Sequence, residues 1–102
     1  MIHETIEGFA AALPPHGALM GLDLGTKTVG VAVSDTFRSV STPLQTIRRT
    51  KFTADAVAIE ALLTARTVVG IILGLPLNMD GSEGPRGQAT RAFARNMARR
   101  ID

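Results

Sequence analysis

Asp23 and the glycine turn that follows it are the residues of this sequence best suited to chemistry. Asp23 lies within the apolar run of residues 18 to 24, and Gly25 and Lys27 come soon after it. A carboxylate on a strand is held rigidly, and Mg2+ and Mn2+ prefer hard oxygen ligands of this kind. A glycine beside it lets a phosphate or a sugar approach the main chain. We therefore interpret Asp23 as the first candidate for a catalytic metal ligand.

Asp23 also has a purely structural interpretation, because aspartate near a turn commonly hydrogen-bonds the local backbone. Its neighbours Leu22 and Leu24 favour the functional interpretation, since a carboxylate in an apolar run costs desolvation energy unless something pairs with it. Lys27 is a candidate phosphate contact, but a lysine in a turn is at least as often a purely structural residue that faces solvent.

A polar loop that follows the apolar run of residues 68 to 73 is the second candidate site. Asn78, Asp80 and Glu83 lie in this loop and could contact a metal, its water ligands or a nucleic-acid sugar. Asp-Gly and Ser-Glu-Gly-Pro are also ordinary turn sequences, so composition alone favours a structural loop. Two-metal phosphodiester hydrolysis needs several convergent carboxylates. The sequence leaves open whether any of these acids reaches Asp23.

Composition and charge limit the function classes. The chain has 102 residues, no cysteine, no Trp or Tyr and four Phe. This length predicts one domain, and the missing thiols exclude a disulfide framework or a thiolate metal site. The chain has almost no aromatic side chains on which nucleic-acid bases could stack. No apolar run of about 20 residues is present, so we expect no membrane span, and no signal peptide is apparent.

Arginine is concentrated near the end of the sequence. Net charge is +2, but Arg91, Arg95 and Arg99 recur about one helical turn apart, in a segment that also holds Arg86 and Arg100. This stripe suits a phosphate-rich partner, and it is equally typical of a solvated helix face.

The hydrophobic pattern predicts an α/β fold in the order strand, strand, strand, helix, strand, helix. Extended segments at residues 18–23, 29–34 and 39–47 indicate an antiparallel meander, and Pro43 favours an edge strand or a bulge. Thr53 or Asp55 is expected to cap a helix, and residues 68–73 suit a parallel strand buried on both faces. Residues 87–101 predict the last helix. We expect residues 1–17 to be an N-terminal extension with a helical turn or two, and residues 18–102 to be the domain.

With both motifs, the chain resembles the YqgF (RuvX) family, Holliday junction resolvase-like proteins regarded as pre-16S ribosomal RNA nucleases. The resemblance rests on residues 22–34 (Leu-Asp-Leu-Gly-Thr-Lys-Thr-Val-Gly-Val-Ala-Val-Ser), 42–44 (Thr-Pro-Leu) and 72–83 (Ile-Leu-Gly-Leu-Pro-Leu-Asn-Met-Asp-Gly-Ser-Glu). Actin-like ATPases and sugar kinases also carry an Asp-x-Gly-Thr turn like that of residues 23–26, so the first of these segments alone is weak evidence. The 72–83 stretch, at this distance from the first, is far more specific.

This resemblance implies an RNase H-like mixed sheet and nuclease activity. It implies hydrolysis of phosphodiester bonds with Mg2+ or Mn2+, at the 5′ end of 16S ribosomal RNA, in the cytoplasm. Asp23 matches the family's first catalytic aspartate and would be a metal ligand. The candidate contacts with structured RNA or DNA junctions are Lys27, Asn78, Asp80, Glu83, Arg91 and Arg95.

The family's other acidic residues, in an Asp-Glu-Arg motif and in a later helix, would fall after Asp102. The resemblance therefore implies an incomplete RNase H-like domain, with the C-terminal strand and helices missing. A sheet edge exposed in this way could pair with a second copy to form a homodimer.

Two other function classes stay open at the level of sequence. One is a nucleotide-binding module of the actin-like ATPase type, although 102 residues leave no room for its second domain. The other is a non-catalytic RNA- or ribosome-binding protein that uses the arginine stripe.

Overall fold

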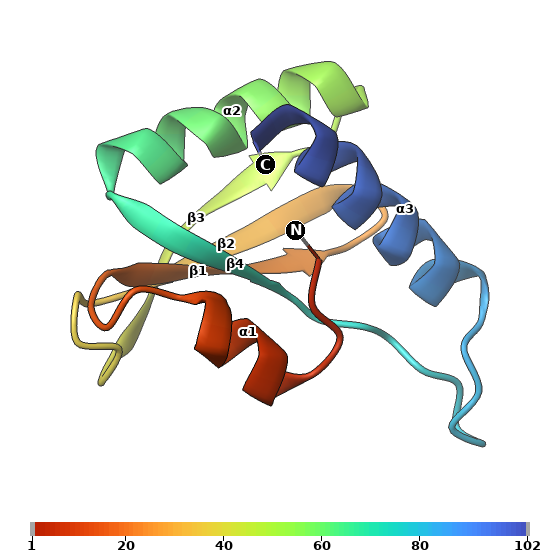
Figure 1. The fold of residues 1–102 in the computed structure, drawn as a ribbon. Helices are drawn as coiled ribbons and strands as arrows, with labels where there is room; N and C mark the ends of the chain where they lie inside the picture. The colour runs from red at the N-terminus through yellow and green to blue at the C-terminus, as the bar shows by residue number, and fades with distance from the viewer. Residues whose placement is uncertain (1, 102) are drawn as a thin grey trace.

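The computed structural model describes residues 2–101 and has one mixed sheet with helices on both faces. In chain order the elements are α1 (Ile6–Ala12), β1 (Ala18–Leu24), β2 (Thr28–Ser34), β3 (Ser41–Arg48), α2 (Phe52–Ala65), β4 (Val68–Leu73) and α3 (Pro85–Ile101). The strand order is β3-β2-β1-β4, with β1 antiparallel to β2 and parallel to β4 (Figure 1). The predicted α/β class and order of elements are confirmed.

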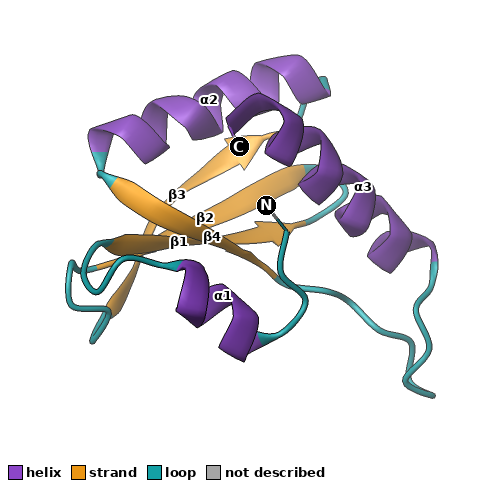
Figure 2. Cartoon of the chain, viewed as in Figure 1, coloured by secondary structure: helices purple, strands orange, loops and turns teal. Residues whose placement is uncertain are grey.

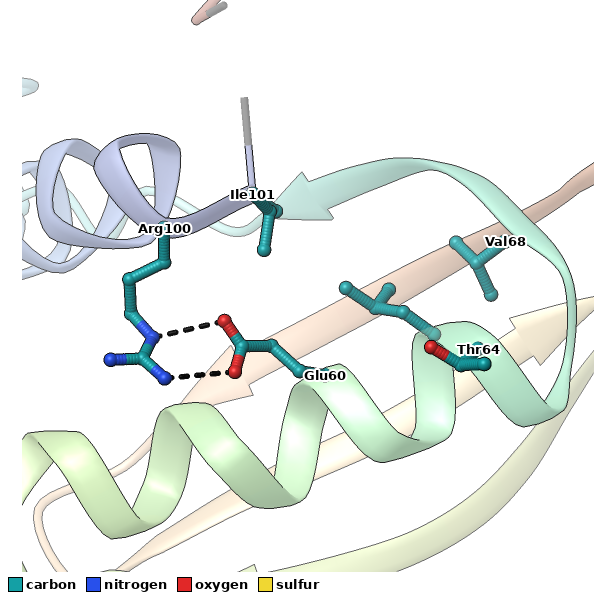
Figure 3. Close-up of a pocket in the computed structure, with 6 residues that line it drawn as sticks. Glu60, Thr64, Val68, Arg100 and Ile101 are labelled. Atoms are coloured by element: carbon teal, nitrogen blue, oxygen red, sulfur yellow. Dashed lines mark hydrogen bonds and ion pairs between the residues drawn. The ribbon is translucent and has the colours of Figure 1, made fainter.

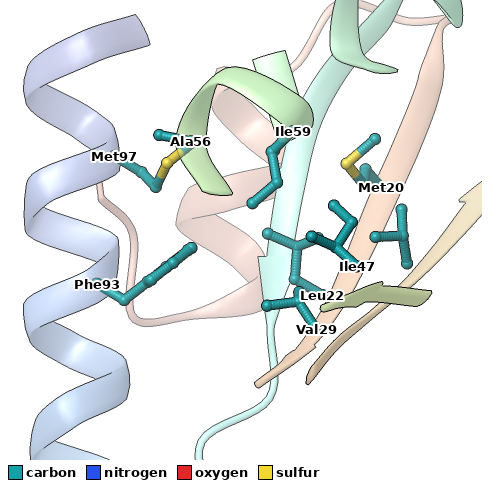
Figure 4. Close-up of a cluster of buried hydrophobic side chains, with 9 residues drawn as sticks. Met20, Leu22, Val29, Ile47, Ala56, Ile59, Phe93 and Met97 are labelled. Carbon is teal, nitrogen blue, oxygen red and sulfur yellow. The ribbon is translucent and has the colours of Figure 1, made fainter. Parts of the chain in front are cut away.

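The hydrophobic core lies between the sheet and the two longer helices. Figure 2 shows α2 and α3 on one face of the sheet and α1 on the other. Alternate residues of β1 and β2 point into the core, as strand geometry requires. There Met20 and Val29 meet Ile59 of α2, and Phe93 of α3 packs in the same cluster (Figure 4). Met20, Val29 and Ile59 are the largest fully buried side chains.

Helix α1 packs on the opposite face, over the strand β4. A Cβ atom at Gly70 would lie 2.8 Å from both Phe9 Cζ and Leu13 Cδ2, so the missing side chain makes room for α1. Arg38 ties the end of the N-terminal segment to the β2–β3 loop by donating hydrogen bonds to the carbonyl groups of Pro14 and Gly17. Residues before β1 therefore pack on the sheet rather than extending away from it.

The edge position expected for the proline-containing strand is confirmed. Strand β3 pairs with β2 alone among the described strands. Val31 pairs with Gln45 while Ala32 pairs with Pro43, so Leu44 is an additional residue in β3. Proline cannot donate a ladder hydrogen bond, and an irregular edge strand accommodates it.

Two local predictions are wrong. The N-cap of α2 is Lys51, without a side-chain hydrogen bond; the buried Asp55 lies inside the first turn and accepts the backbone N–H of Thr50. Strand β4 is parallel to β1 as expected, but it is an edge strand within residues 2–101, and Ile72 is 50% exposed rather than buried. A continuous apolar run does not distinguish a central strand from an edge strand.

Candidate functional site

Asp23 lies near the carboxyl end of β1, which has β2 on one side and β4 on the other. Its side chain is exposed, on the face of the sheet opposite α2 and α3. The expected desolvation of this carboxylate is therefore wrong, because strand alternation turns Leu22 into the core while Asp23 points outward. No cation among the described residues forms a salt bridge with it.

Glycine keeps the surface around Asp23 open. Gly30 is the cross-strand partner of Asp23, and a Cβ atom there would lie 3.6 Å from Asp23 Cβ. At Gly21, two residues earlier in β1, a Cβ atom would meet no atom of the described residues 2–101 within 4 Å. Gly21, Asp23 and Gly30 line one side of an open hollow that continues over Pro43 and Thr46 of β3. The carboxylate is thus accessible to a large ligand such as a nucleic acid.

The turn after Asp23 is held by two arginines from distant parts of the chain. Arg49 Nη1 donates to the carbonyl oxygen of Gly25 at 2.6 Å, and Arg86 Nη2 donates to that of Leu24 at 3.0 Å. The N–H of Gly25 closes the turn on the carbonyl of Thr28 at 2.8 Å. Lys27 is exposed within the same turn. The sequence offered no signal for Arg49, and for Arg86 it offered only a place among the arginines near the end of the chain, because both contacts join residues that are far apart in the sequence.

The loop after β4 begins beside Asp23 and then forms a turn of its own. The N–H of Gly74 donates to the carbonyl of Leu22 at 3.4 Å, since the two parallel strands end at the same edge. Asn78 Nδ2 donates to the hydroxyl oxygen of Ser82 within the loop. The backbone N–H and the hydroxyl of Ser82 both donate to Asp80 Oδ1. Ser82 holds the pKa of Asp80 below its ordinary value, first through its hydroxyl and then through its backbone N–H. The structure thus places Asn78 and Asp80 in turn-forming bonds.

Glu83 and Arg91 form part of an ion-pair network. Arg91 Nε donates to Glu83 at 2.8 Å, and Arg91 Nη1 pairs with Glu4 from the segment before α1. The hydrogen bond that Arg91 donates to Glu83 raises the pKa of Arg91 most, followed by the one that it donates to Glu4. Arg95 is exposed one turn further along α3. The structure brings Glu83 and Arg91 together with each other rather than with Asp23.

A metal centre built from several acidic side chains does not fit residues 2–101 alone. Within that range no group of three or more His, Cys, Asp or Glu side chains is arranged to hold an ion. Asp23 supplies one carboxylate ligand, whereas a two-ion hydrolytic site needs several.

A second open hollow lies far from Asp23, between the carboxyl-terminal parts of α2 and α3. Its wall includes a fork-shaped ion pair in which Arg100 Nε and Nη2 each donate to Glu60 at 2.9 Å (Figure 3). This pair lowers the pKa of Glu60 and raises that of Arg100, through the hydrogen bonds first. Its charges are satisfied by each other, and it serves to join the two helices.

No helix in the described part of the chain is long and apolar enough to span a membrane.

Comparison with known proteins gives consistent matches over nearly the whole chain. The model of the RuvX family, described as Holliday junction resolvase, matches residues 17–102. A protein of Cereibacter sphaeroides named "Putative pre-16S rRNA nuclease" is 68% identical over 98 residues, which are 96% of this chain and 61% of that protein. Relatives with the same name in Ruegeria pomeroyi and Paracoccus denitrificans are 68% and 66% identical over 99 residues, covering 64% and 63% of their lengths. The chain therefore spans about three fifths of the length of the curated relatives it matches.

Proposed function

Because this chain belongs to the RuvX family, described as Holliday junction resolvase, we propose that it acts in metal-dependent hydrolysis of phosphodiester bonds. The name of its relatives points to the precursor of 16S ribosomal RNA as the substrate, in ribosome biogenesis. That substrate would place the chain in the cytoplasm.

The observation that carries this proposal is the position of Asp23. An exposed carboxylate at the end of a strand in the middle of the sheet, beside Gly21 and Gly30, leaves room for a phosphodiester. Asp23 would hold Mg2+ or Mn2+ as one of its oxygen ligands. When bound, such an ion polarises the phosphate and activates water. The chain's own contribution is a carboxylate held rigidly by pairing of Asp23 with Gly30 of β2 and by the β4 pairing that ends one residue earlier, at Leu22.

The test is cleavage of end-labelled structured RNA by this chain and by its Asp23→Asn variant, in Mg2+ or Mn2+. Cleavage by the parent chain and none by the variant would support the proposal, with the additional acidic ligands supplied from outside residues 2–101, for example by a second copy of the chain. The variant should fold as the parent does, since Asp23 is exposed and forms no salt bridge with a described residue. Equal cleavage by both proteins would reject Asp23 as a catalytic residue.

Non-catalytic RNA binding is the second candidate function. It is favoured by one observation, the lack of a multi-acid cluster within residues 2–101. This alternative predicts RNA binding that withstands Asp23→Asn, with no cleavage by either protein. The same assay, read for binding as well as for products, distinguishes the two functions.

A homodimer through β4 is part of the proposal. The outer edge of β4 pairs with no other strand in the described range, and such edges are templates for pairing between chains. Sedimentation across micromolar concentrations should show self-association. A strictly monomeric profile would reject the dimer and leave the nuclease proposal untouched.

A further inference from the structure

We infer that the turn after Asp23, rather than the arginine stripe of α3, binds the phosphodiester backbone of the nucleic acid. The binding groups are Lys27, Arg49 and Arg86, which we call the turn cations. This inference rests on the proposed function, because it concerns how a nucleic acid is presented to Asp23.

The turn cations converge although they come from three separate segments. Arg49 follows β3 and reaches Gly25 O, Arg86 lies in the first turn of α3 and reaches Leu24 O, and Lys27 belongs to the turn. The backbone N–H of Arg49 also donates to Lys27 O at 2.8 Å. These carbonyls belong to residues directly after Asp23, and a strand advances only about 3.3 Å per residue. The positive charge is therefore held within a few residues of the proposed catalytic carboxylate.

The charges of the turn cations are not neutralised by protein carboxylates. None of the three forms a salt bridge with an acid in residues 2–101. A carbonyl oxygen accepts a hydrogen bond but carries no net charge, and each guanidinium has five N–H donors. Arg49 and Arg86 each bond one carbonyl oxygen, which leaves donors for a phosphate. Guanidinium groups pre-oriented in this way suit phosphate recognition.

Two of the arginines of α3 beyond Arg86 differ in this respect. Arg91 is bound between Glu4 and Glu83, and Arg100 is bound to Glu60 through two hydrogen bonds. A phosphate would have to compete with those carboxylates for both arginines. The stripe also begins more than a helical turn beyond Arg86, the arginine of α3 that contacts the Asp23 strand. Like the turn cations, Arg95 and Arg99 form no salt bridge with an acid in residues 2–101, so it is proximity to Asp23 that favours the turn over these two arginines.

The experiment compares two triple variants with the same change in net charge, each in an Asp23→Asn background to prevent cleavage. One variant is Lys27→Gln/Arg49→Gln/Arg86→Gln. The other is Arg66→Gln/Arg95→Gln/Arg99→Gln, which changes the exposed residue that caps the C-terminal end of α2 and two exposed arginines of α3. Binding to a fluorescent RNA stem-loop and to a DNA four-way junction is measured across a range of salt concentrations.

We expect the turn triple to reduce the slope of log K against log salt by about 2 to 3, because each lost phosphate contact removes about 0.7–0.9. The other triple should change the slope by less than half as much. Equal losses, or a larger loss from Arg66, Arg95 and Arg99, would overturn this inference and leave the proposed function standing. Failure of the parent chain to bind either nucleic acid would instead count against the proposed function. The tighter of the two ligands identifies the source of the phosphodiester.

Arg49 and Arg86 also stabilise the turn, so the turn triple changes both its charge and its local structure. A single charge reversal at Lys27 tests the effect of charge alone. The exposed side chain of Lys27 can be substituted without removing the hydrogen bonds that Arg49 and Arg86 donate to the turn. Lys27→Glu should weaken RNA binding and lower the slope by about 1 or more. Arg66→Glu, at the far end of α2, is the matched control and should retain most of the affinity. Equal affinity of these two variants would overturn the inference.

Discussion

Asp23 and Gly30 face each other across the antiparallel pair of β1 and β2. Gly30 thereby leaves one side of the carboxylate open, in a position where most strands would carry a side chain. Its backbone is ordinary, since it is not among the residues with positive φ, so the glycine is not required by backbone conformation. The open space beside Asp23 is what a large anionic ligand needs.

A branched side chain at residue 30 should close the site without unfolding the protein, whereas alanine should not. A Cβ atom at 3.6 Å from Asp23 Cβ is in ordinary van der Waals contact, so Gly30→Ala should keep access to the carboxylate. Gly30→Val adds two methyl groups beside it while suiting a strand, where propensities span about 1 kcal/mol. We expect Mn2+ to broaden the Asp23 amide signal in NMR spectra of the alanine variant, and much less in the valine variant. Equal broadening in both would show that Gly30 does not control access.

The core should depend strongly on Ile59. This side chain of α2 is fully buried against the sheet. Ile59→Ala therefore leaves a cavity and should lower the free energy of unfolding by about 2–5 kcal/mol. Val57 lies in the same helix but is 54% exposed, and Val57→Ala should change it by only about 0.5 kcal/mol. Urea unfolding followed by circular dichroism measures both. Similar losses in the two variants would contradict the observed orientation of α2.

Docking of α1 should depend on the missing side chain at Gly70. Gly70→Val would press on Phe9 and Leu13, and because these are the ends of side chains, α1 should move while the sheet stays intact. Amide hydrogen exchange should then speed up several-fold in residues 6–12 but not in β1. Gly21→Val, on the same sheet face where a Cβ meets nothing within 4 Å, is the control and should leave α1 protected.

Acid should weaken the β2–β3 loop through Asp35. The backbone N–H of Val40 lowers the pKa of Asp35 most, and burial partly offsets it; Ser39 lowers it further through its hydroxyl and backbone N–H. A folded-state pKa below the unfolded value of about 3.9 means that Asp35 contributes stability above that value. This contribution is lost as the pH falls through the folded pKa. Stability between about pH 6 and pH 3 should therefore fall less in Asp35→Asn than in the parent chain.

The variant Ser39→Ala provides a graded check on this pH dependence. It removes the hydroxyl that donates to Asp35 Oδ2 at 2.9 Å but keeps both backbone donors. The pKa of Asp35 should therefore rise part of the way toward its ordinary value, as an NMR titration would show. An unchanged titration of Asp35 in this variant would contradict the assigned cause.

Local patterns predicted most of the secondary structure, because the spacing of apolar residues directly reflects which face of an element is buried. The alternation in β1 and β2 and the proline of β3 were sufficient to predict a meander with an irregular edge. The N-cap of α2 was predicted incorrectly, because Asp55 accepts the Thr50 N–H from inside the first turn. Burial of β4 was also predicted incorrectly, since the number of neighbouring strands is not encoded in a run of apolar residues.

The sequence by itself determined the fold class, the family and the candidate residue Asp23, since these depend on residue types at short spacing. Only the tertiary structure showed that Asp23 is exposed beside Gly30, that Arg91 lies between Glu4 and Glu83, and that Arg49 and Arg86 meet at the turn after Asp23. Those relationships join residues brought together by strand order and helix packing. A charged side chain has the same sequence signature whether it faces solvent, a carboxylate or a carbonyl oxygen, so its partner is decided by the fold.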